Sequence, residues 1–264
     1  MDAPNLEGRT ALVTGGGRGI GRATCIALAR RGARVVVVAR SENEIEDVAS
    51  EIQSAGGQAE AIACDISDEP SVKQLADTAA GVDILINNAG AVHPIAPIVS
   101  VDFSDWRRNI GVNLDGVFLT CRYLVPGMVE RRWGRVVNVT AGAVKGNQTA
   151  WGAYSAAKGA VEVLTKVLAR EVGDKGVHAN VVRPGIVDTD MQRAIRDTDE
   201  REFGRENLER FRGYKERGLL RNPEDPARLI LWLLSADGDG TNGEVLIIDD
   251  PEVAARVGLQ PMGR

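Results

Sequence analysis

The feature that most constrains the fold of this chain is the alternation of short apolar runs with longer amphipathic stretches. Several runs are unbroken stretches of valine and isoleucine, which is typical of strands covered on both faces. The expected strands are Thr10–Val13, Arg34–Ala39, Ala59–Ala63, Ile84–Ile86, Arg135–Val139, Val177–Val182 and Glu244–Ile248. The expected helices are Ile20–Arg31, Glu42–Ala55, Ser71–Ala79, Ser104–Glu130, Ala153–Lys175 and Asp225–Leu234. This order predicts right-handed βαβ units and therefore an α/β fold, a doubly wound parallel sheet with helices on both faces.

The alternation runs on without a linker or an internal repeat, so we expect a single domain over residues 1–249. Residues 250–264 are then a surface tail or a partner-docking arm. Residues 191–217 interrupt the pattern, because they are dense in Arg, Glu and Asp and follow an expected strand. Open parallel sheets bind ligands at the carboxyl ends of their strands, so this segment is either a solvated helical excursion or a helical lid over a substrate site.

Composition argues against several classes of partner. The 264 residues carry a net charge of −5, with 26% charged and only 4% aromatic residues. This balance disfavours nucleic-acid binding and a polybasic membrane surface, and no apolar run approaches the ~20 residues of a membrane span. Cys25, Cys64 and Cys121 are isolated from one another. We therefore expect free thiols in a cytoplasmic protein, no bound metal, and a small molecule as the partner.

A glycine-rich turn, Thr14–Gly21, lies directly between the first expected strand and the first expected helix. Glycines at this point let the backbone approach a pyrophosphate, which the N–H groups of the helix N-terminus then bind. The spacing differs from the G-x-G-x-x-G of the long dehydrogenases, and no Gly-Lys-Ser/Thr follows, which argues against a P-loop. The residues of the turn that we expect to contact a dinucleotide are Gly15, Gly17, Arg18, Gly19, Ile20 and Gly21.

The end of the second expected strand indicates which dinucleotide. Counting eighteen positions from Gly21 leads to Ala39, which Arg40 follows, and neither is the acidic residue that binds the ribose of NAD. Arg40 and Arg18 can instead bind a 2′-phosphate. The alternative is that both are ordinary surface arginines. We favour NADP(H) as the cofactor.

Tyr154 and Lys158 are four residues apart at the start of an expected helix, so their side chains share one face. A tyrosine with a pKa near 10 is a poor acid–base catalyst at neutral pH, and a neighbouring ammonium is expected to lower that pKa. The pair could give a proton to a carbonyl oxygen or take one from an alcohol while hydride moves at carbon.

Five motifs occur together in one order: the glycine-rich turn, Asn87–Gly90, Asn113, Tyr154–Lys158 and Pro184-Gly185. Their order and spacing resemble the classical short-chain dehydrogenase/reductase family across the chain to about Asp249. The resemblance implies a Rossmann-fold oxidoreductase of class EC 1.1.1 that needs no metal. It implies that the catalytic residues are Asn113, Tyr154 and Lys158, with Asn113 holding a helix kink and a water of the proton relay. It also implies a homodimer or homotetramer, paired through the two long helices.

The same resemblance implies further cofactor contacts. Asp65 and Ile66 would lie at the adenine, and Asn87 to Gly90 would support the sheet beside the cofactor. Lys158 would bind the nicotinamide ribose, beside Tyr154. The residues expected to contact the cofactor in these segments are Asp65, Ile66, Asn88, Ala89, Gly90, Tyr154, Lys158, Pro184, Gly185, Val187 and Thr189.

The segment Pro184–Gln192, together with Asn242–Val245, is similar to the sepiapterin reductase and benzil reductase branch of the family. Members of that branch reduce ketones, often vicinal diketones or α-hydroxyketones, with NADPH. Asp190 would then anchor a polar substrate group; the alternative is that it caps the N-terminus of a helix opening the lid segment.

One position departs from the family pattern. The catalytic serine is expected thirteen residues before Tyr154, where this chain has Ala141. Losing such a donor costs about 10²–10³ in rate. Thr140 could replace it only if a local bulge turned its side chain, since neighbouring strand residues face opposite ways.

We therefore expect an NADPH-dependent ketone or diketone reductase whose substrate contacts include Ala141, Tyr154 and Asp190. The alternatives are an impaired or engineered variant, an NADP-binding sensor without turnover, an alcohol dehydrogenase, or a 3-oxoacyl-thioester reductase.

Overall fold

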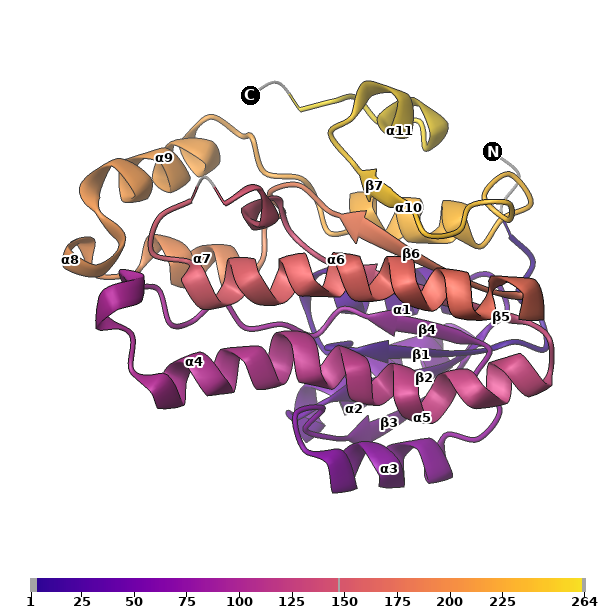
Figure 1. The fold of residues 1–264 in the computed structure, drawn as a ribbon. Coiled ribbons are helices and arrows are strands. Elements are labelled where there is room, and N and C mark those ends of the chain that lie inside the picture. The colour runs from indigo at the N-terminus through magenta and orange to yellow at the C-terminus, as the bar shows by residue number, and fades with distance from the viewer. Residues whose placement is uncertain (1–3, 147, 263–264) are drawn as a thin grey trace.

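All seven expected strands form one parallel sheet. The computed structural model describes residues 4–146 and 148–262. The strands are β1 (Thr10–Thr14), β2 (Arg34–Ala39), β3 (Gln58–Ala63), β4 (Ile84–Asn87), β5 (Gly134–Val139), β6 (Val177–Arg183) and β7 (Val245–Ile247), in the order β3-β2-β1-β4-β5-β6-β7. Each neighbouring pair is parallel (Figure 1). The predicted doubly wound α/β fold is confirmed.

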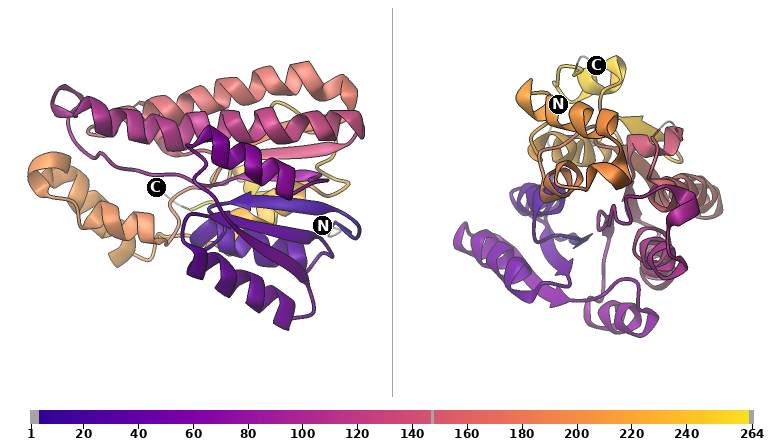
Figure 2. Two further views of the ribbon diagram at one scale, coloured as in Figure 1. Left: turned by 90° about the horizontal axis from the view of Figure 1, so that it is seen from below. Right: turned by 90° about the vertical axis from the view of Figure 1, so that its left-hand side faces the viewer.

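Helices cover both faces of this sheet (Figure 2). They are α1 (Gly19–Ala29), α2 (Glu42–Ser54), α3 (Glu69–Thr78), α4 (Phe103–Ile110), α5 (Gly116–Glu130), α6 (Gly152–Val172) and α10 (Glu224–Leu233). Along β1, Ala11 and Val13 belong to the core under α1, α2 and α10, whereas Leu12 between them belongs to the core under α3, α5 and α6. This two-residue alternation explains why apolar strands unbroken by polar residues are needed here.

The stretch predicted as one helix over Ser104–Glu130 is interrupted. A π-helical turn, Gly111–Asp115, separates α4 from α5. The side chain of Asn113 lies in this turn and bonds to backbone groups on a different segment, as described below. A contact of this kind with a distant segment cannot be read from helical periodicity.

Residues 190–216 form three helices at the carboxyl-terminal side of the sheet, the side toward which the strands point in Figure 1. They are α7 (Asp190–Arg196), α8 (Glu200–Phe203) and α9 (Arg205–Glu216). The C-terminal segment forms α11 (Pro251–Arg256), and its Ala254 and Val257 are buried against the core. Residues 258–262 follow this helix without a further helix or strand and are mostly exposed; residues 263–264 of the expected tail lie outside the described residues.

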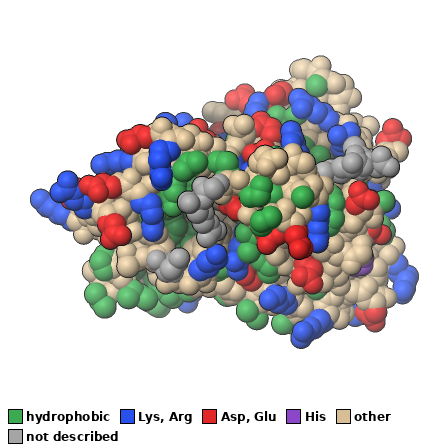
Figure 3. Space-filling view, turned by 90° about the horizontal axis from the view of Figure 1, so that it is seen from above, with side chains coloured by type: hydrophobic (Ala, Val, Ile, Leu, Met, Phe, Trp, Pro, Cys, Tyr) green, Lys and Arg blue, Asp and Glu red, His purple; other side chains and the backbone are tan. Residues whose placement is uncertain are grey.

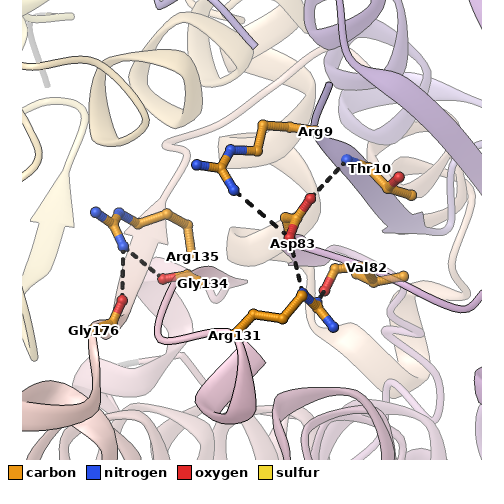
Figure 4. Close-up of polar contacts among 8 residues, drawn as sticks. All are labelled: Arg9, Thr10, Val82, Asp83, Arg131, Gly134, Arg135 and Gly176. Carbon is orange, nitrogen blue, oxygen red and sulfur yellow. Dashed lines mark hydrogen bonds and ion pairs between the residues drawn. The ribbon is translucent and has the colours of Figure 1, made fainter. Parts of the chain in front are cut away.

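A charged cluster fixes the amino-terminal edge of the sheet (Figure 4). Asp83, which is 7% exposed, accepts from the Thr10 N–H at 3.2 Å and pairs with Arg131 at 3.4 Å and Arg9 at 3.9 Å. These contacts lie at the end of the strands opposite to the carboxyl ends. The binding site must be sought at the other edge.

Candidate active site

A cavity of about 1010 Å³ lies at the carboxyl-terminal edge of the sheet. In Figure 3, hydrophobic side chains gather in a hollow with Lys and Arg side chains around it. The predicted site residues that line the cavity are Gly15, Gly17, Arg18, Gly19, Ile20, Arg40, Asp65, Ile66, Asn88, Ala89, Gly90, Ala141, Tyr154, Lys158, Pro184, Gly185, Val187, Thr189 and Asp190. Gly21 and Asn113, which sequence analysis also selected, lie behind the wall.

The glycine-rich turn is built so that side chains cannot enter it. Gly15 and Gly19 have positive φ values of 63° and 53°. A Cβ on Gly21 would lie 2.0 Å from the carbonyl oxygen of Gly15, so Gly21 shapes the turn from behind. Asn88 donates from Nδ2 to the carbonyl oxygens of Thr14 at 2.9 Å and Gly15 at 3.1 Å. The turn therefore leaves a backbone-lined cradle at the N-terminus of α1, which suits a pyrophosphate.

The two arginines predicted to bind a 2′-phosphate have different surroundings. Arg40 is exposed on the cavity wall. Arg18 is paired with Asp190 at 3.4 Å and with Glu44 at 3.7 Å. Sequence analysis missed Glu44, although its position in the first turn of the helix after Arg40 places it near this end of the cavity. Arg40 is thus the better candidate for a new anionic partner.

Asp65 lies near Arg40 at the same end of the cavity. Burial alone would raise the pKa of Asp65, but two hydrogen bonds from Ser67 and the positive charge of Arg40 lower it below its ordinary value. The Ser67 hydroxyl donates to Oδ1 at 2.6 Å and the Ser67 N–H at 2.9 Å. Asp65 is therefore an ionised acceptor at neutral pH.

Tyr154 and Lys158 both line the cavity and are only 6% and 3% exposed. Lys158 donates from Nζ to the carbonyl oxygen of Val139 at 3.0 Å, and Nζ lies 5.9 Å from the centre of the Tyr154 ring. Burial raises the pKa of Tyr154 to about 12 and lowers the pKa of Lys158 to about 8. The expected lowering of the tyrosine pKa is absent from the chain alone, because burial of the phenol raises it.

Asn113 is fully buried in the π-helical turn. Its Nδ2 donates to the carbonyl oxygen of Ala91 at 2.7 Å, and its Oδ1 accepts from the Ala91 N–H at 3.2 Å. A Cβ on Gly90 would lie 3.0 Å from this Oδ1 and 3.4 Å from Lys158 Nζ. Asn113 therefore lies behind the Gly90–Ala91 backbone, close to Lys158, in the π-helical turn between α4 and α5.

The wall beside Tyr154 contains the position predicted for the serine. Ala141 is extended, with φ −152° and ψ 162°, and it lines the cavity. The hydroxyl of Thr140 donates to Glu162 Oε1 at 2.9 Å, so it already has a partner. Asp190 begins α7, where it pairs with Arg18 and Arg193, while Thr189 occupies the N-cap position.

Sequence analysis missed an aromatic cluster that closes the far end of the cavity. Five of the eleven aromatic residues gather there: Trp151, Tyr154, Phe203, Phe211 and Tyr214. Trp151 stacks on Phe203 and meets the Tyr154 ring edge-on, both with ring centres 5.8 Å apart. The aromatic residues of 203–214 were the available signal, since the rest of the chain is poor in them.

Among the described residues, none of the helices combines the length and apolar character needed to cross a membrane. Likewise, within residues 4–146 and 148–262 the His, Cys, Asp and Glu side chains form no group that could hold a metal ion.

Comparison with known proteins agrees with this geometry. A family model described as short chain dehydrogenase matches residues 9–200. The chain is 34% identical over 251 residues to a 3-oxoacyl-acyl-carrier-protein reductase of Vibrio harveyi, covering 93% of this chain and 97% of that protein.

Two solved structures are similar over nearly the whole chain. One is a protein of Beutenbergia cavernae described as an NAD(P)-dependent gluconate 5-dehydrogenase with NADP bound at low occupancy (34% identity, TM-score 0.84, 95% and 98% of the two chains). The other is a 3-oxoacyl-acyl-carrier-protein reductase of Brucella melitensis with bound NAD (30% identity, TM-score 0.78, 93% and 91%).

Proposed function

Because the chain belongs to the short chain dehydrogenase family of NAD(P)-binding oxidoreductases, we propose that it is an NADP(H)-dependent reductase of a ketone or vicinal diketone. The observation that carries the proposal is the buried pair of Tyr154 and Lys158, on successive turns of α6, in the cavity that the glycine-rich turn also lines. A proton donor and a dinucleotide cradle in one cavity are the two parts that carbonyl reduction needs.

The residues present fit a dinucleotide. A Cβ added at Gly15, Gly17 or Gly21 would meet neighbouring protein atoms at 2.9, 2.8 and 2.0 Å, so these glycines keep the turn tight. The backbone N–H groups of such a turn would hold a pyrophosphate. Asp65 and Ile66 would hold the adenine, and residues 184–189 would flank the nicotinamide. When bound, the reduced nicotinamide supplies the hydride.

The exposed guanidinium of Arg40 supports NADP over NAD. The similar structures include one with NADP and one with NAD, so it is this residue that supports the choice. Neither Ala39, the last residue of β2, nor Arg40 after it is a carboxylate that could bind a free ribose 2′-OH.

Tyr154 acts as the general acid. Its raised pKa keeps the phenol protonated at neutral pH, ready to give a proton to the substrate oxygen. Lys158 remains a cation below about pH 8 and favours the negative charge that develops on the phenol oxygen. Asn113 keeps the Gly90–Ala91 backbone beside Lys158, and it would hold a water of the proton relay.

The reductase works without the hydroxyl that the family pattern expects at Ala141. Thr140 does not replace it, since its hydroxyl donates to Glu162. The retained Asn113, Tyr154 and Lys158 argue for turnover, because a sensor that only binds NADP has no use for a buried phenol beside its cofactor. Similarity to 3-oxoacyl reductases makes reduction of a 3-oxoacyl thioester the second candidate.

Residues at the far end of the cavity and in the neighbouring loop support a diketone substrate and the sepiapterin and benzil reductase branch. The segment Pro184–Gln192 resembles sepiapterin and benzil reductases, and the aromatic wall around Trp151 suits a flat, apolar diketone. Helices α7 to α9 form the lid of this end, and Asp190 anchors a polar group of the substrate near the cofactor.

The chain assembles through α5 and α6. Phe118, Val163 and Val167 are 47%, 63% and 46% exposed on these helices, which is unusual for large apolar side chains of a monomer. A homodimer or homotetramer would cover them. The three cysteines are free and buried, which agrees with the reducing conditions of the cytoplasm.

The replacement Tyr154→Phe tests the proposal. It removes the proton donor and keeps the ring, so NADPH oxidation with a diketone should fall to background while NADPH still binds. Tyr123→Phe is the matched control, because that phenol donates to Glu69 at the surface, away from the cavity. Turnover that survives Tyr154→Phe would overturn the mechanism.

A further inference from the structure

A buried charged cluster that the proposed mechanism does not use lies directly behind the catalytic wall. Glu162 accepts two hydrogen bonds from Arg183, Nε to Oε1 and Nη2 to Oε2, both at 2.7 Å. The hydroxyl of Thr140 donates to the same Oε1 at 2.9 Å. The Glu162 and Arg183 side chains are 11% and 15% exposed, so this bidentate pair is largely withdrawn from water.

The three residues come from the three elements that carry the active site. Thr140 follows β5 and precedes Ala141. Glu162 lies on α6, one turn after Lys158 and two turns after Tyr154. Arg183 ends β6 and precedes Pro184-Gly185. One carboxylate therefore joins the carboxyl ends of two strands to the catalytic helix.

The contacts of Lys158 complete the arrangement. Lys158 donates to the carbonyl oxygen of Val139, and Thr140, the next residue, donates to Glu162. Two consecutive residues of the β5 end are thus held by two side chains one turn apart on α6. A shift of this strand end would move the acceptor on which the position of Lys158 Nζ depends.

Burying such an ion pair contributes little net free energy to folding. Desolvating a carboxylate and a guanidinium offsets most of their attraction, and apolar residues of similar volume often serve the stability of a core equally well. The geometry therefore indicates that the ion pair serves to position the ends of β5 and β6 relative to α6, rather than to stabilise the fold.

We propose that Glu162 is a positioning residue for the reduction. By holding Thr140 and Arg183 together it fixes the acceptor of Lys158 and the start of the 184–189 loop relative to Tyr154. The inference rests on the proposed reductase and adds to it a group that touches neither substrate nor cofactor.

The test separates position from stability with an apolar triple variant, Thr140→Val/Glu162→Met/Arg183→Met, which leaves no charge unpaired. We expect its thermal unfolding to stay close to that of the wild type and its kcat for NADPH-dependent reduction to fall at least tenfold. The dissociation constant for NADPH should change by a smaller factor than kcat, because the glycine turn and Arg40, which follow β1 and β2, keep their own contacts. A stable triple variant with wild-type kcat would overturn the proposal.

If the triple variant does not fold, two single substitutions at Thr140 test the same proposal. Thr140→Val removes one hydrogen bond and leaves the ion pair, and should lower kcat several-fold; Thr140→Ser keeps the hydroxyl and should restore it. Equal kcat for the two contradicts the proposal. Asp83→Asn is the control, since it removes a buried charge at the opposite edge of the sheet and should affect stability without a specific loss of kcat.

Amide hydrogen exchange in the chain without NADPH gives a readout that needs no turnover. Thr140→Val should speed exchange at residues 141–146, and the triple variant also at residues 185–189. If none of the carbonyls tested supports NADPH oxidation by the wild type, the proposed function fails. The exchange rates then still show whether Glu162 and Thr140 hold these two segments in position. Unchanged exchange in both segments overturns the inference.

Discussion

The replacement Ala141→Ser adds the one donor that the proposed active site lacks. Ala141 has extended backbone angles, lines the cavity, and contacts the apolar cluster that contains Tyr154. A serine can take the same backbone conformation, and its hydroxyl then lies on the cavity side, where the alanine methyl is now. The neighbouring Thr140 keeps its hydrogen bond to Glu162, so the new serine hydroxyl does not replace an existing contact.

The expected gain follows from the energy of one preorganised donor. Such a donor aimed at a developing oxyanion is worth about 10²–10³ in rate, or roughly 3–4 kcal/mol of barrier. Part of this is lost if the substrate already has compensating contacts, so we set the lower limit at about tenfold in kcat, or about 1.4 kcal/mol. The stability of the chain should change little, because Ala141 is only half-buried.

The assay is NADPH consumption with a panel of ketones and vicinal diketones, run on the wild type and on Ala141→Ser. Ala143→Ser is the matched control, since Ala143 also lines the cavity but stands two residues from the predicted position. A gain below tenfold on every carbonyl that the wild type reduces would refute the idea that a missing hydroxyl limits the rate. A similar gain for Ala143→Ser would refute its specificity.

Three further predictions concern the cofactor and the proton. Because burial lowers the pKa of Lys158 from 10.5 to about 8, its ammonium is present below about pH 8 and lost above it, so kcat/KM for reduction should fall as pH rises through 8; a profile flat to pH 10 contradicts this. Arg40→Asp should raise KM for NADPH at least tenfold and favour NADH, and an unchanged preference for NADPH would exclude the 2′-phosphate contact. Gly21→Ala should abolish NADPH binding measured by fluorescence, since its Cβ would clash with the Gly15 carbonyl oxygen; wild-type affinity would mean that the turn adapts.

The central strands could be predicted closely because both faces of the sheet are buried there. Arg34–Ala39 is a strand with the predicted bounds, and the other runs differ by a residue or so at their ends. Local composition is sufficient there, since only continuous apolar runs can fill two cores at once. The break in Ser104–Glu130 could not be predicted in this way. It accompanies the bonds of Asn113 to Ala91, a residue on a loop that follows a different strand.

In the candidate site, too, local features could be predicted from the sequence and contacts between distant segments could not. Motifs that act through their own backbone, such as the glycine turn, could be found from sequence because their geometry is local. Pairings between elements could not: nothing in the sequence links Glu162 to Arg183, or Arg18 to Glu44, before the fold brings them together. The aromatic wall was missed for a related reason, since Trp151 and Phe203 are distant in the chain and only the fold brings their rings into contact.

The Tyr154–Lys158 pair shows how far spacing alone can lead. A separation of four residues places both side chains on one face of α6, and from this a lowered tyrosine pKa was expected. Yet a shared face does not lower the pKa of the resting phenol, because Tyr154 is buried and Lys158 Nζ donates to the carbonyl oxygen of Val139. The chain alone therefore holds a phenol with a pKa of about 12, which is a proton donor and not a base. A phenol that is protonated at neutral pH can donate its proton without being ionised first, which supports carbonyl reduction as the proposed direction of the reaction.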